Sequence, residues 1–512
     1  MKELFLFVRP PRPLWPFSGP SSAFWPPLAF ASMAAALRER LPDLRVAILD
    51  APALQMGWRT LEAELHRLRP AYIGMGEEAV SCVEAFRLAR LARELRPDFA
   101  GADPVGRTRV IAGGCFFGHA AAQTLGTGLV DVVVHGEGER TLCDLVPALR
   151  DGTASSLAGV NGISYLEDGK VVSTPAAPLI SDLDTLPFPA YDLLPMERYG
   201  RGSRNHPDLA AIELGRGCVG SCDFCILWRQ MGRFVGRQPV AHYRAKSPER
   251  LLEEIRILST RHGRRYLGWV DPCYNAHPAI PGQLSELLLR ENLCPGQSAW
   301  VRADSLVRDS ASGALKSCVN AGLNEVYIGI ERPDDAGLAG LGKTSHTGDA
   351  RTALDLLHRE HPHVLTVGSF IYGLPGDTPA TIQALHHLIC ELGLDQFFFI
   401  PWTPMPGTNG WRDELWDDRG EYFRKHNFLP GTDLWPHQRA LERALLKSLA
   451  FHWPLSRIRA TLELLWSPHD RRRRVTGRLF ARGIRFQASS FIRGISESRD
   501  PAGMVFPAWY ES

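Results

Sequence analysis

The sequence predicts an α/β protein that has an open parallel sheet at its N-terminal end, a partial βα barrel in the middle and a helical region at its C-terminal end. Short apolar runs alternate with helical patterns in residues 1–152 and again in residues 208–405. This alternation is typical of parallel sheets covered by helices. Residues 153–207 hold a hairpin pattern and a proline-punctuated strap, so we interpret them as a linker. Residues 406–512 are helical in pattern and rich in aromatic residues.

Five short apolar runs predict a Rossmann-like sheet in the first domain, because buried parallel strands are continuously apolar. They lie at 4–8, 45–49, 71–74, 109–112 and 131–135, with helical patterns such as 85–95 between them. Ligands of such sheets bind beyond the carboxyl ends of the strands. Here those ends carry Met75-Gly76-Glu77, Gly113-Gly114 and Gly136-Glu137-Gly138. One glycine-rich turn alone is equally well explained by tight chain reversal, but three at corresponding positions favour a flat or bulky ligand against bare backbone.

The sequence also predicts the elements of the linker, the second domain and the tail. A hairpin is predicted within 162–172, and the strap Leu183–Pro189 follows it. The barrel strands are predicted at 210–214, 266–270, 299–302, 325–330, 366–371 and 396–400. In the tail, the run Arg471–Arg474 is interpreted as a solvated helix face.

Composition sets the class of protein. The 512 residues are 45% hydrophobic and 22% charged, with a formal net charge of +2. These values exclude a disordered or fibrous chain, and they give nucleic-acid binding no support. No run approaches the roughly 18 apolar residues of a membrane span, and no secretory signal is recognised. Ten cysteines are too dilute for a disulfide scaffold, so we expect a cytoplasmic protein in which clustered cysteines bind metal.

Three cysteines carry the strongest signal of the sequence. Cys218, Cys222 and Cys225 lie on a glycine-rich loop directly after a predicted strand. Structural zinc requires four protein ligands, and Cys273 and His242 are the nearest candidates for a fourth. Three thiolates can also hold an iron–sulfur cluster that leaves one iron open. We favour the cluster over zinc.

The Cys-x3-Cys-x2-Cys spacing after the first barrel strand resembles the radical S-adenosylmethionine (SAM) superfamily. The resemblance implies a [4Fe–4S] cluster on Cys218, Cys222 and Cys225, with SAM on the open iron and its reductive cleavage to a 5′-deoxyadenosyl radical. The usual Gly-Gly-Glu pattern of the family is absent from this chain, and the segment that holds Asp271 takes its place. By the same resemblance, the residues expected to bind SAM are Phe224, Asp271, Arg302, Glu331 and Gly373.

The N-terminal domain resembles that of the cobalamin-binding branch of this superfamily, through the segment His135–Glu139 and the Leu-Pro-x-Pro strap. The resemblance implies cobalamin against Met75, Gly76, Glu77, Gly113, Gly114, Gly136, Glu137 and Gly138. The Asp-x-His-x-x-Gly pattern that supplies an axial histidine elsewhere is missing, and His119 is interpreted as an ordinary residue at a helix start.

The function implied by this branch is methyl transfer to an unactivated carbon of a small molecule, with an external electron donor of the flavodoxin or ferredoxin type. The alternative is oxidation or cyclisation of a large planar substrate such as a tetrapyrrole, because the anaerobic magnesium-protoporphyrin monomethyl ester cyclase shares the domain order. The sequence assigns no catalytic side chain.

Two further classes are weighed against these. One is a zinc-binding interaction protein. The other is a tRNA-modifying radical enzyme with a second cluster, for which Cys82, Cys115 and Cys143 are too widely spread. The other cysteines, Cys273, Cys294, Cys318 and Cys390, are interpreted as packing residues. For Trp402, Trp411 and Trp416 we prefer core or interdomain packing to a substrate pocket.

Overall fold

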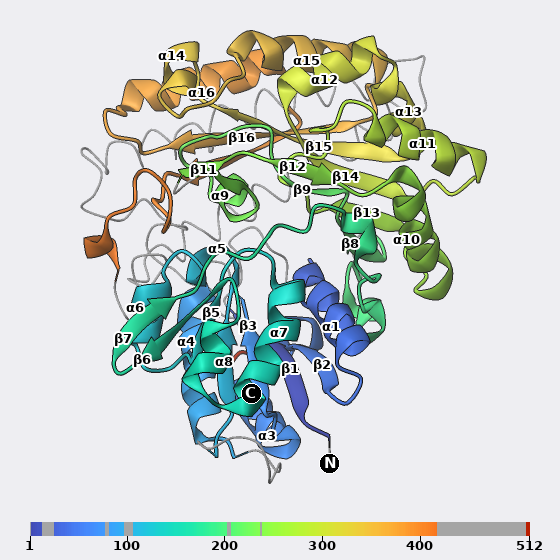
Figure 1. Cartoon of the computed structure of the whole chain (residues 1–512). Helices are drawn as coiled ribbons and strands as arrows, with labels where there is room; N and C mark the ends of the chain where they lie inside the picture. Colours follow the sequence, from blue (N-terminus) through green and yellow to red (C-terminus); the bar gives the residue numbers. More distant parts are fainter. Residues whose placement is uncertain are drawn as a thin grey trace.

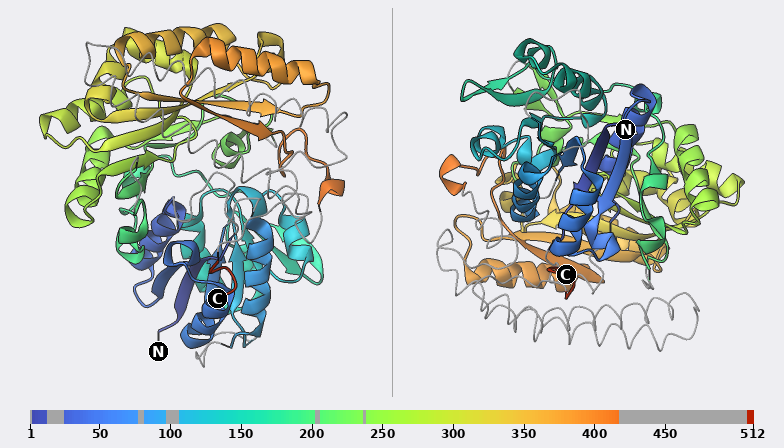
Figure 2. Two further views of the ribbon diagram at one scale, coloured as in Figure 1. Left: turned by 180° about the vertical axis from the view of Figure 1, so that it is seen from behind. Right: turned by 90° about the horizontal axis from the view of Figure 1, so that it is seen from below.

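The computed structural model describes residues 2–12, 25–76, 81–96, 106–201, 206–235, 238–416 and 508–512. Glu77 and the tail segment 417–507, which contains the four-arginine run, lie outside the described residues. Two α/β units lie one above the other (Figure 1, Figure 2). None of the helices in the described ranges is long and apolar enough to cross a membrane.

The N-terminal unit is built on a seven-stranded sheet with the order β2-β1-β3-β4-β5-β6-β7. The neighbours from β2 to β5 are parallel, whereas β6 and β7 are antiparallel. The order 2-1-3-4-5 is that of flavodoxin-like sheets, which bind ligands where the strand order reverses. The strands are β1 (Leu4–Arg9), β2 (Arg45–Asp50), β3 (Tyr72–Met75), β4 (Arg109–Ala112), β5 (Val132–Val134), β6 (Ile163–Glu167) and β7 (Lys170–Ser173).

The hairpin β6–β7 differs from the expectation that it belongs to a linker. Its first strand pairs with β5, so the hairpin extends the N-terminal sheet. The reason is burial, since Ile163 and Tyr165 enter the core on one face of this sheet. Helices cover both faces: α1 (Leu28–Arg40), α2 (Ala51–Leu54), α3 (Trp58–Leu68), α4 (Cys82–Glu94), α5 (Gly114–Phe117), α6 (Ala121–Gly126), α7 (Gly138–Asp151) and α8 (Ala154–Ala158).

Residues 508–512, at the other end of the chain, lie against the N-terminal unit (Figure 1). The Trp58 amide donates to the carbonyl of Tyr510 at 2.9 Å, and the two rings meet edge to face at 6.3 Å. The Tyr510 hydroxyl donates to Glu84 Oε1 at 3.0 Å, and Arg87 pairs with Glu511 at 2.8 Å. Tyr510 is therefore part of the N-terminal core.

The second unit is built on six parallel strands in the order β17-β16-β15-β14-β13-β8. They form the predicted partial barrel, and each predicted run contributes one strand. Strand β16 is buried along its whole length, which explains why it is mostly apolar and carries no charged residue. The strands are β8 (Leu209–Ile212), β13 (Tyr266–Trp269), β14 (Gly296–Val301), β15 (Leu323–Glu331), β16 (Leu365–Tyr372) and β17 (Gln396–Pro401).

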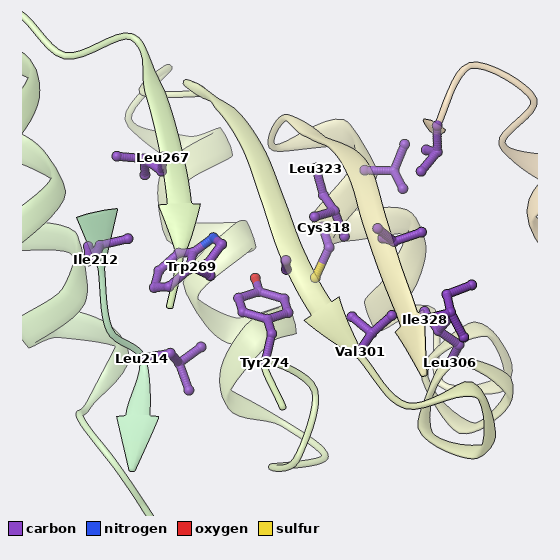
Figure 3. Close-up of a cluster of buried hydrophobic side chains, with 14 of the residues drawn as sticks. Ile212, Leu214, Leu267, Trp269, Tyr274, Val301, Leu306, Cys318, Leu323 and Ile328 are labelled. Atoms are coloured by element: carbon purple, nitrogen blue, oxygen red, sulfur yellow. The ribbon is translucent and has the colours of Figure 1, made fainter. Parts of the chain in front are cut away.

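Helices cover the outer face of this sheet, and the N-terminal unit lies on its opposite side (Figure 1). They are α10 (Pro248–Arg261), α11 (Ile280–Arg290), α12 (Ala303–Ala311), α13 (Ala314–Asn320), α14 (Asp335–Ala339), α15 (Thr347–Glu360) and α16 (Pro379–Leu392). Figure 3 shows part of the core beneath them, where Ile212, Trp269, Val301 and Ile328 come from four neighbouring strands. Because side chains alternate along a strand, the other residues of each strand face the N-terminal unit.

Short elements join the two units. A 3₁₀ turn occurs at each of Leu183–Thr185, Tyr191–Leu193, Met196–Arg198 and Asp413–Leu415. The cysteine loop is framed by β9 (Gly215–Gly217), α9 (Leu227–Gln230), β10 (Arg233–Val235), β11 (Gln238–Val240) and β12 (Tyr243–Ala245). Strand β9 pairs with β12 in a two-stranded antiparallel ribbon.

Candidate active site

The three predicted cluster ligands lie on one half-buried loop that follows β8 and β9. A hydrogen bond from the Cys273 thiol, with the Gly220 amide 3.3 Å from the sulfur, lowers the pKa of Cys218 to about 6. Burial raises the pKa of Cys225 to about 11, and the neighbouring thiols Cys222 and Cys218 add to the rise. The three thiols therefore lie within electrostatic reach of one another.

Cys273 is not a simple packing residue, because its buried thiol touches that of Cys218. The sequence names it only as a candidate fourth ligand for zinc. In the described part of the chain, no three His, Cys, Asp or Glu side chains are gathered as ligands of a single metal ion. That Cys218, Cys222 and Cys225 are the ligands of a cluster therefore stays a prediction from their spacing on one loop.

Asp271 holds the start of this loop. Its carboxylate is buried and accepts hydrogen bonds from the Leu214 amide at 3.0 Å and the Gly215 amide at 2.6 Å. Burial raises its pKa to about 7 in spite of these hydrogen bonds. The next turn requires Gly217, whose φ is +91° and whose Cβ would lie 1.8 Å from the His242 carbonyl oxygen. Asp271 thus shapes the loop with both of its oxygens.

Arg302 lies over the cysteine loop. A Cβ atom on Gly220 would lie 2.7 Å from Arg302 Nη1. The guanidinium is held by Asp304 at 3.0 and 2.6 Å and by the Thr344 hydroxyl at 3.1 Å. Its positive charge is one of the influences that lower the pKa of Cys218. The structure therefore brings the predicted residue Arg302 beside the predicted ligands.

Glu331 ends β15 at a bulge, with a φ of +66°. Lys343 Nζ donates to the Gly329 carbonyl at 2.7 Å and lies 3.3 Å from Glu331 Oε1. Burial raises the pKa of Glu331, and Lys343 opposes that rise. Both charges also act on the pKa of Cys222, which places the pair beside the loop. Lys343 was missed by sequence reasoning, because a lone lysine after a glycine carries no fixed spacing signal.

Gly373 forms the turn after β16 with a φ of +84°. Its amide donates to Asp377 Oδ2 at 2.8 Å, and Arg332 pairs with the same carboxylate at 2.5 Å. This ion pair joins the turn to the end of β15, beside Glu331. Phe224 lies half-buried on the loop between the second and third cysteines.

The glycines at the carboxyl edge of the N-terminal sheet divide into two groups. Gly114 and Gly136 have φ values of +84° and +67°, and a Cβ on either would meet no atom within 4 Å. Gly76 packs against the Gly113 carbonyl, and Gly113 donates to the Met75 carbonyl at 3.0 Å, so β3 and β4 end side by side. Gly114 and Gly136 therefore leave bare backbone with open space beside it at this edge of the sheet.

Gly138 and Glu137 serve other contacts. A Cβ on Gly138 would lie 2.5 Å from Met33 Sδ, so this glycine allows α7 to approach α1. The Glu137 carboxylate points to arginines of the second unit. The side-chain Nε2 of Gln230, at the end of α9, donates to the Gly136 carbonyl at 3.1 Å. The glycine edge and the cysteine loop therefore face each other across the two units.

The remaining aromatic and cysteine residues mostly pack. Trp416 stacks on Phe116 at 5.8 Å, and Trp411 packs against the same core. Cys82, Cys143 and Cys318 are buried, whereas Cys115 is half-buried. The interpretation of Cys294 and Cys390 as packing residues is wrong, because both side chains are exposed.

Comparison with known proteins identifies the class. Residues 212–389 match the family model of the radical SAM superfamily. A Pyrococcus horikoshii protein named as an uncharacterized methyltransferase is 29% identical over 75% of this chain and 78% of its own length. The anaerobic magnesium-protoporphyrin IX monomethyl ester cyclase of Rubrivivax gelatinosus is 26% identical over 79% of this chain and 69% of its own. Residues 212–389 are thus a radical SAM domain, and the cysteine triplet that predicts this class lies within them.

Comparison with solved structures shows which overall fold the chain has. The radical SAM methyltransferase TsrM of Kitasatospora setae, solved with cobalamin and a [4Fe–4S] cluster, superposes with a TM-score of 0.62 at 16% identity. The match covers 95% of this chain and 100% of that one. The predicted α/β fold class is therefore confirmed, and the chain shares the overall fold of TsrM.

Proposed function

We propose that this chain is a cobalamin-dependent radical SAM enzyme that transfers a methyl group to an unactivated carbon of a small molecule. One observation carries the proposal. The open glycine edge of the N-terminal sheet faces the cysteine loop, with Gln230 in contact with Gly136 at 3.1 Å. A corrin on that edge and a cluster on that loop would be neighbours, and the relatives named as methyltransferases support this use.

Each cofactor has its own set of residues. When bound, the cluster supplies the electron that cleaves SAM, and cobalamin supplies the methyl group. Cys218, Cys222 and Cys225 would hold the cluster. Arg302 and Lys343 place positive charge beside the loop, which suits the carboxylate of SAM. Glu331 is a buried acceptor for a hydroxyl group, and Phe224 and Gly373 provide apolar surface and backbone. Cobalamin would lie over Gly114 and Gly136, beside Met75, Gly76 and Gly113.

The proposal includes a reductant and a compartment. Cleavage of SAM consumes an electron, so a one-electron donor of the flavodoxin or ferredoxin type is required. The three ligand cysteines must stay reduced until the cluster forms, and the proposal assigns the enzyme to the cytoplasm because that compartment keeps thiols reduced.

The test begins with anaerobic reconstitution by iron, sulfide and hydroxocobalamin, followed by SAM with a deuterated methyl group and titanium(III) citrate. We expect bound iron, bound corrin and formation of S-adenosylhomocysteine, each measured by absorbance or mass spectrometry. Stoichiometric zinc without iron would refute the proposal. Replacement of all three cysteines by alanine is the control that must abolish iron binding.

A second candidate function is oxidation or ring closure of a large planar substrate, which the similarity to the magnesium-protoporphyrin cyclase favours. The same experiment separates the two. Release of 5′-deoxyadenosine without any S-adenosylhomocysteine would support the oxidase or cyclase.

A matched pair of glycine variants tests the corrin cradle. Gly136 and Gly263 have nearly the same φ, +67° and +63°, and both are open to a Cβ. Backbone strain is therefore comparable in Gly136→Leu and Gly263→Leu. We expect Gly136→Leu to weaken hydroxocobalamin binding at least about tenfold while iron content is kept, and Gly263→Leu to change neither. Equal corrin binding by the two variants would contradict the cradle.

A further inference from the structure

Five buried or half-buried charges meet where the two units touch. Arg216 pairs with Glu137 at 2.7 Å, Glu139 at 2.6 Å and Glu213 at 2.9 Å. Arg244 adds a second contact to Glu137 at 2.9 Å. We call these five side chains the interdomain ion cluster. Apart from Glu213, each has a side-chain exposure of 6% or less.

The ion cluster lies between the two proposed cofactor sites. Glu137 directly follows the open Gly136, and Glu139 is in the first turn of α7. Arg216 precedes Cys218 by two residues. Arg244 stands opposite Arg216 in the β9–β12 ribbon, so one short ribbon presents both guanidinium groups.

The geometry of the ion cluster depends on arginine. Burial opposes charge on Arg216, yet the carboxylates of Glu213 and Glu139 hold its pKa above its usual range. Burial also favours a neutral Glu137, but Arg216 and Arg244 hold the pKa of Glu137 below its usual range. A planar guanidinium can address three carboxylates in fixed directions, which a lysine ammonium cannot do.

Glu137 has further partners that fix its place. Its carboxylate accepts the Ile180 amide at 2.8 Å, and Arg244 donates to the Ile180 carbonyl at 2.6 Å. Charges buried in this way add little net stability, because desolvation offsets their attraction. Removing one partner, however, leaves the others uncompensated, so the arrangement tolerates few alternative positions of the two units.

We infer that Arg216 is a positioning residue that sets the separation and orientation of the glycine edge relative to the cysteine loop. The inference rests on the proposed function, since it concerns where the two cofactors would lie. The chain of contacts is short: the backbone of Gly136, the Glu137 carboxylate, the Arg216 guanidinium, and two residues further Cys218. The positioning role of Arg216 also explains why the Gly136–Glu139 segment has two glutamates, because both carboxylates bind Arg216 of the second unit.

The first experiment uses the full chain without cofactors. Hydrogen exchange is measured at segments 136–142 and 213–217 in wild type, Arg216→Met, Arg216→Lys and Glu139→Gln. We expect exchange to rise about tenfold in both segments together for Arg216→Met, and less for Arg216→Lys. The control is Arg351→Met, which removes an exposed arginine paired with Glu391 on the outer helices and leaves both segments unchanged.

The second experiment uses the reconstituted protein. Pulsed EPR measures the dipolar interaction between the reduced cluster and cob(II)alamin, a readout that reports their separation. We expect one narrow distribution in wild type and Arg351→Met, and a broad one in Arg216→Met with iron and corrin content unchanged. An unchanged distribution in Arg216→Met would overturn the inference.

Two outcomes remain separable from these. If Arg216→Met does not fold, the test uses Glu139→Gln in its place. Hydrogen exchange at 213–217 that is the same in Glu139→Gln as in the control Arg351→Met would then overturn the inference. If the wild type binds no iron or no corrin, the proposed function fails, and the exchange experiment on the cofactor-free chain still tests the positioning role.

Discussion

Asp271→Asn is expected to loosen the start of the cysteine loop. The Asp271 carboxylate accepts the amides of Leu214 and Gly215 at 3.0 and 2.6 Å. Asparagine keeps one acceptor oxygen and turns an NH₂ group toward the other amide, which leaves a buried N–H unsatisfied. That loss costs about 1–3 kcal/mol. The destabilisation should appear in urea unfolding and as lower iron content after reconstitution.

The pH dependence of this effect has a definite sign. Burial raises the pKa of Asp271 to about 7, so the folded protein binds this proton more tightly than the unfolded chain does. The stabilisation is therefore complete below about pH 4 and is lost as the pH rises through about 7. The Asp271→Asn variant has no titrating group at this position and lacks this dependence. The stability gap between wild type and the variant should therefore be wider at pH 5 than at pH 8.

The matched control is Asp192→Asn, which removes an exposed carboxylate paired with Arg38. Exposed pairs contribute about 0–1 kcal/mol, so we expect a small change. If Asp271→Asn matched the control in stability and iron content, or if its gap to wild type were the same at pH 5 and pH 8, the anchoring role would be refuted.

Three further predictions concern other parts of the molecule. Tyr510→Ala should lower the free energy of unfolding by about 3 kcal/mol, because it empties a core position against Trp58; urea unfolding measures this, and a change below about 0.5 kcal/mol would contradict it. Lys343→Met should weaken SAM binding about tenfold with iron content unchanged, since a cation beside the loop is lost; calorimetry on reconstituted protein checks it, and unchanged affinity would remove Lys343 from the site. Tyr199→Phe should cost about 1–2 kcal/mol in thermal or urea unfolding, because its hydroxyl donates to the buried Asp50 carboxylate at 2.7 Å; equal stability would show that the hydrogen bond is dispensable.

Local patterns of sequence predicted the strands well, for a physical reason. Strands such as β1 and β16 are buried on both faces, so their composition alone reveals them. The cysteine triplet is equally local, because its three ligands lie on one loop. The hairpin β6–β7 was recognised, but its place in the N-terminal sheet was not, since pairing with β5 depends on partners distant in sequence.

The rest of the site depends on contacts that sequence spacing does not encode. Glu137 was predicted to face cobalamin, but its carboxylate binds Arg216, 79 residues away. Cys273 and Cys218 meet only because the ends of neighbouring strands converge. Lys343 approaches Glu331 from a turn after α14. Each of these is a consequence of tertiary structure, and no motif in the sequence indicates it.

The contact between α3 and Tyr510 also bears on biosynthesis. Arg59 and Glu511, which are hydrogen-bonded, are separated by 452 positions. A ribosome releases the seven strands of the first sheet long before it releases Tyr510, so a nascent N-terminal unit must wait with an uncovered apolar position beside Trp58. The core around Trp58 can therefore be completed only after the barrel has been translated.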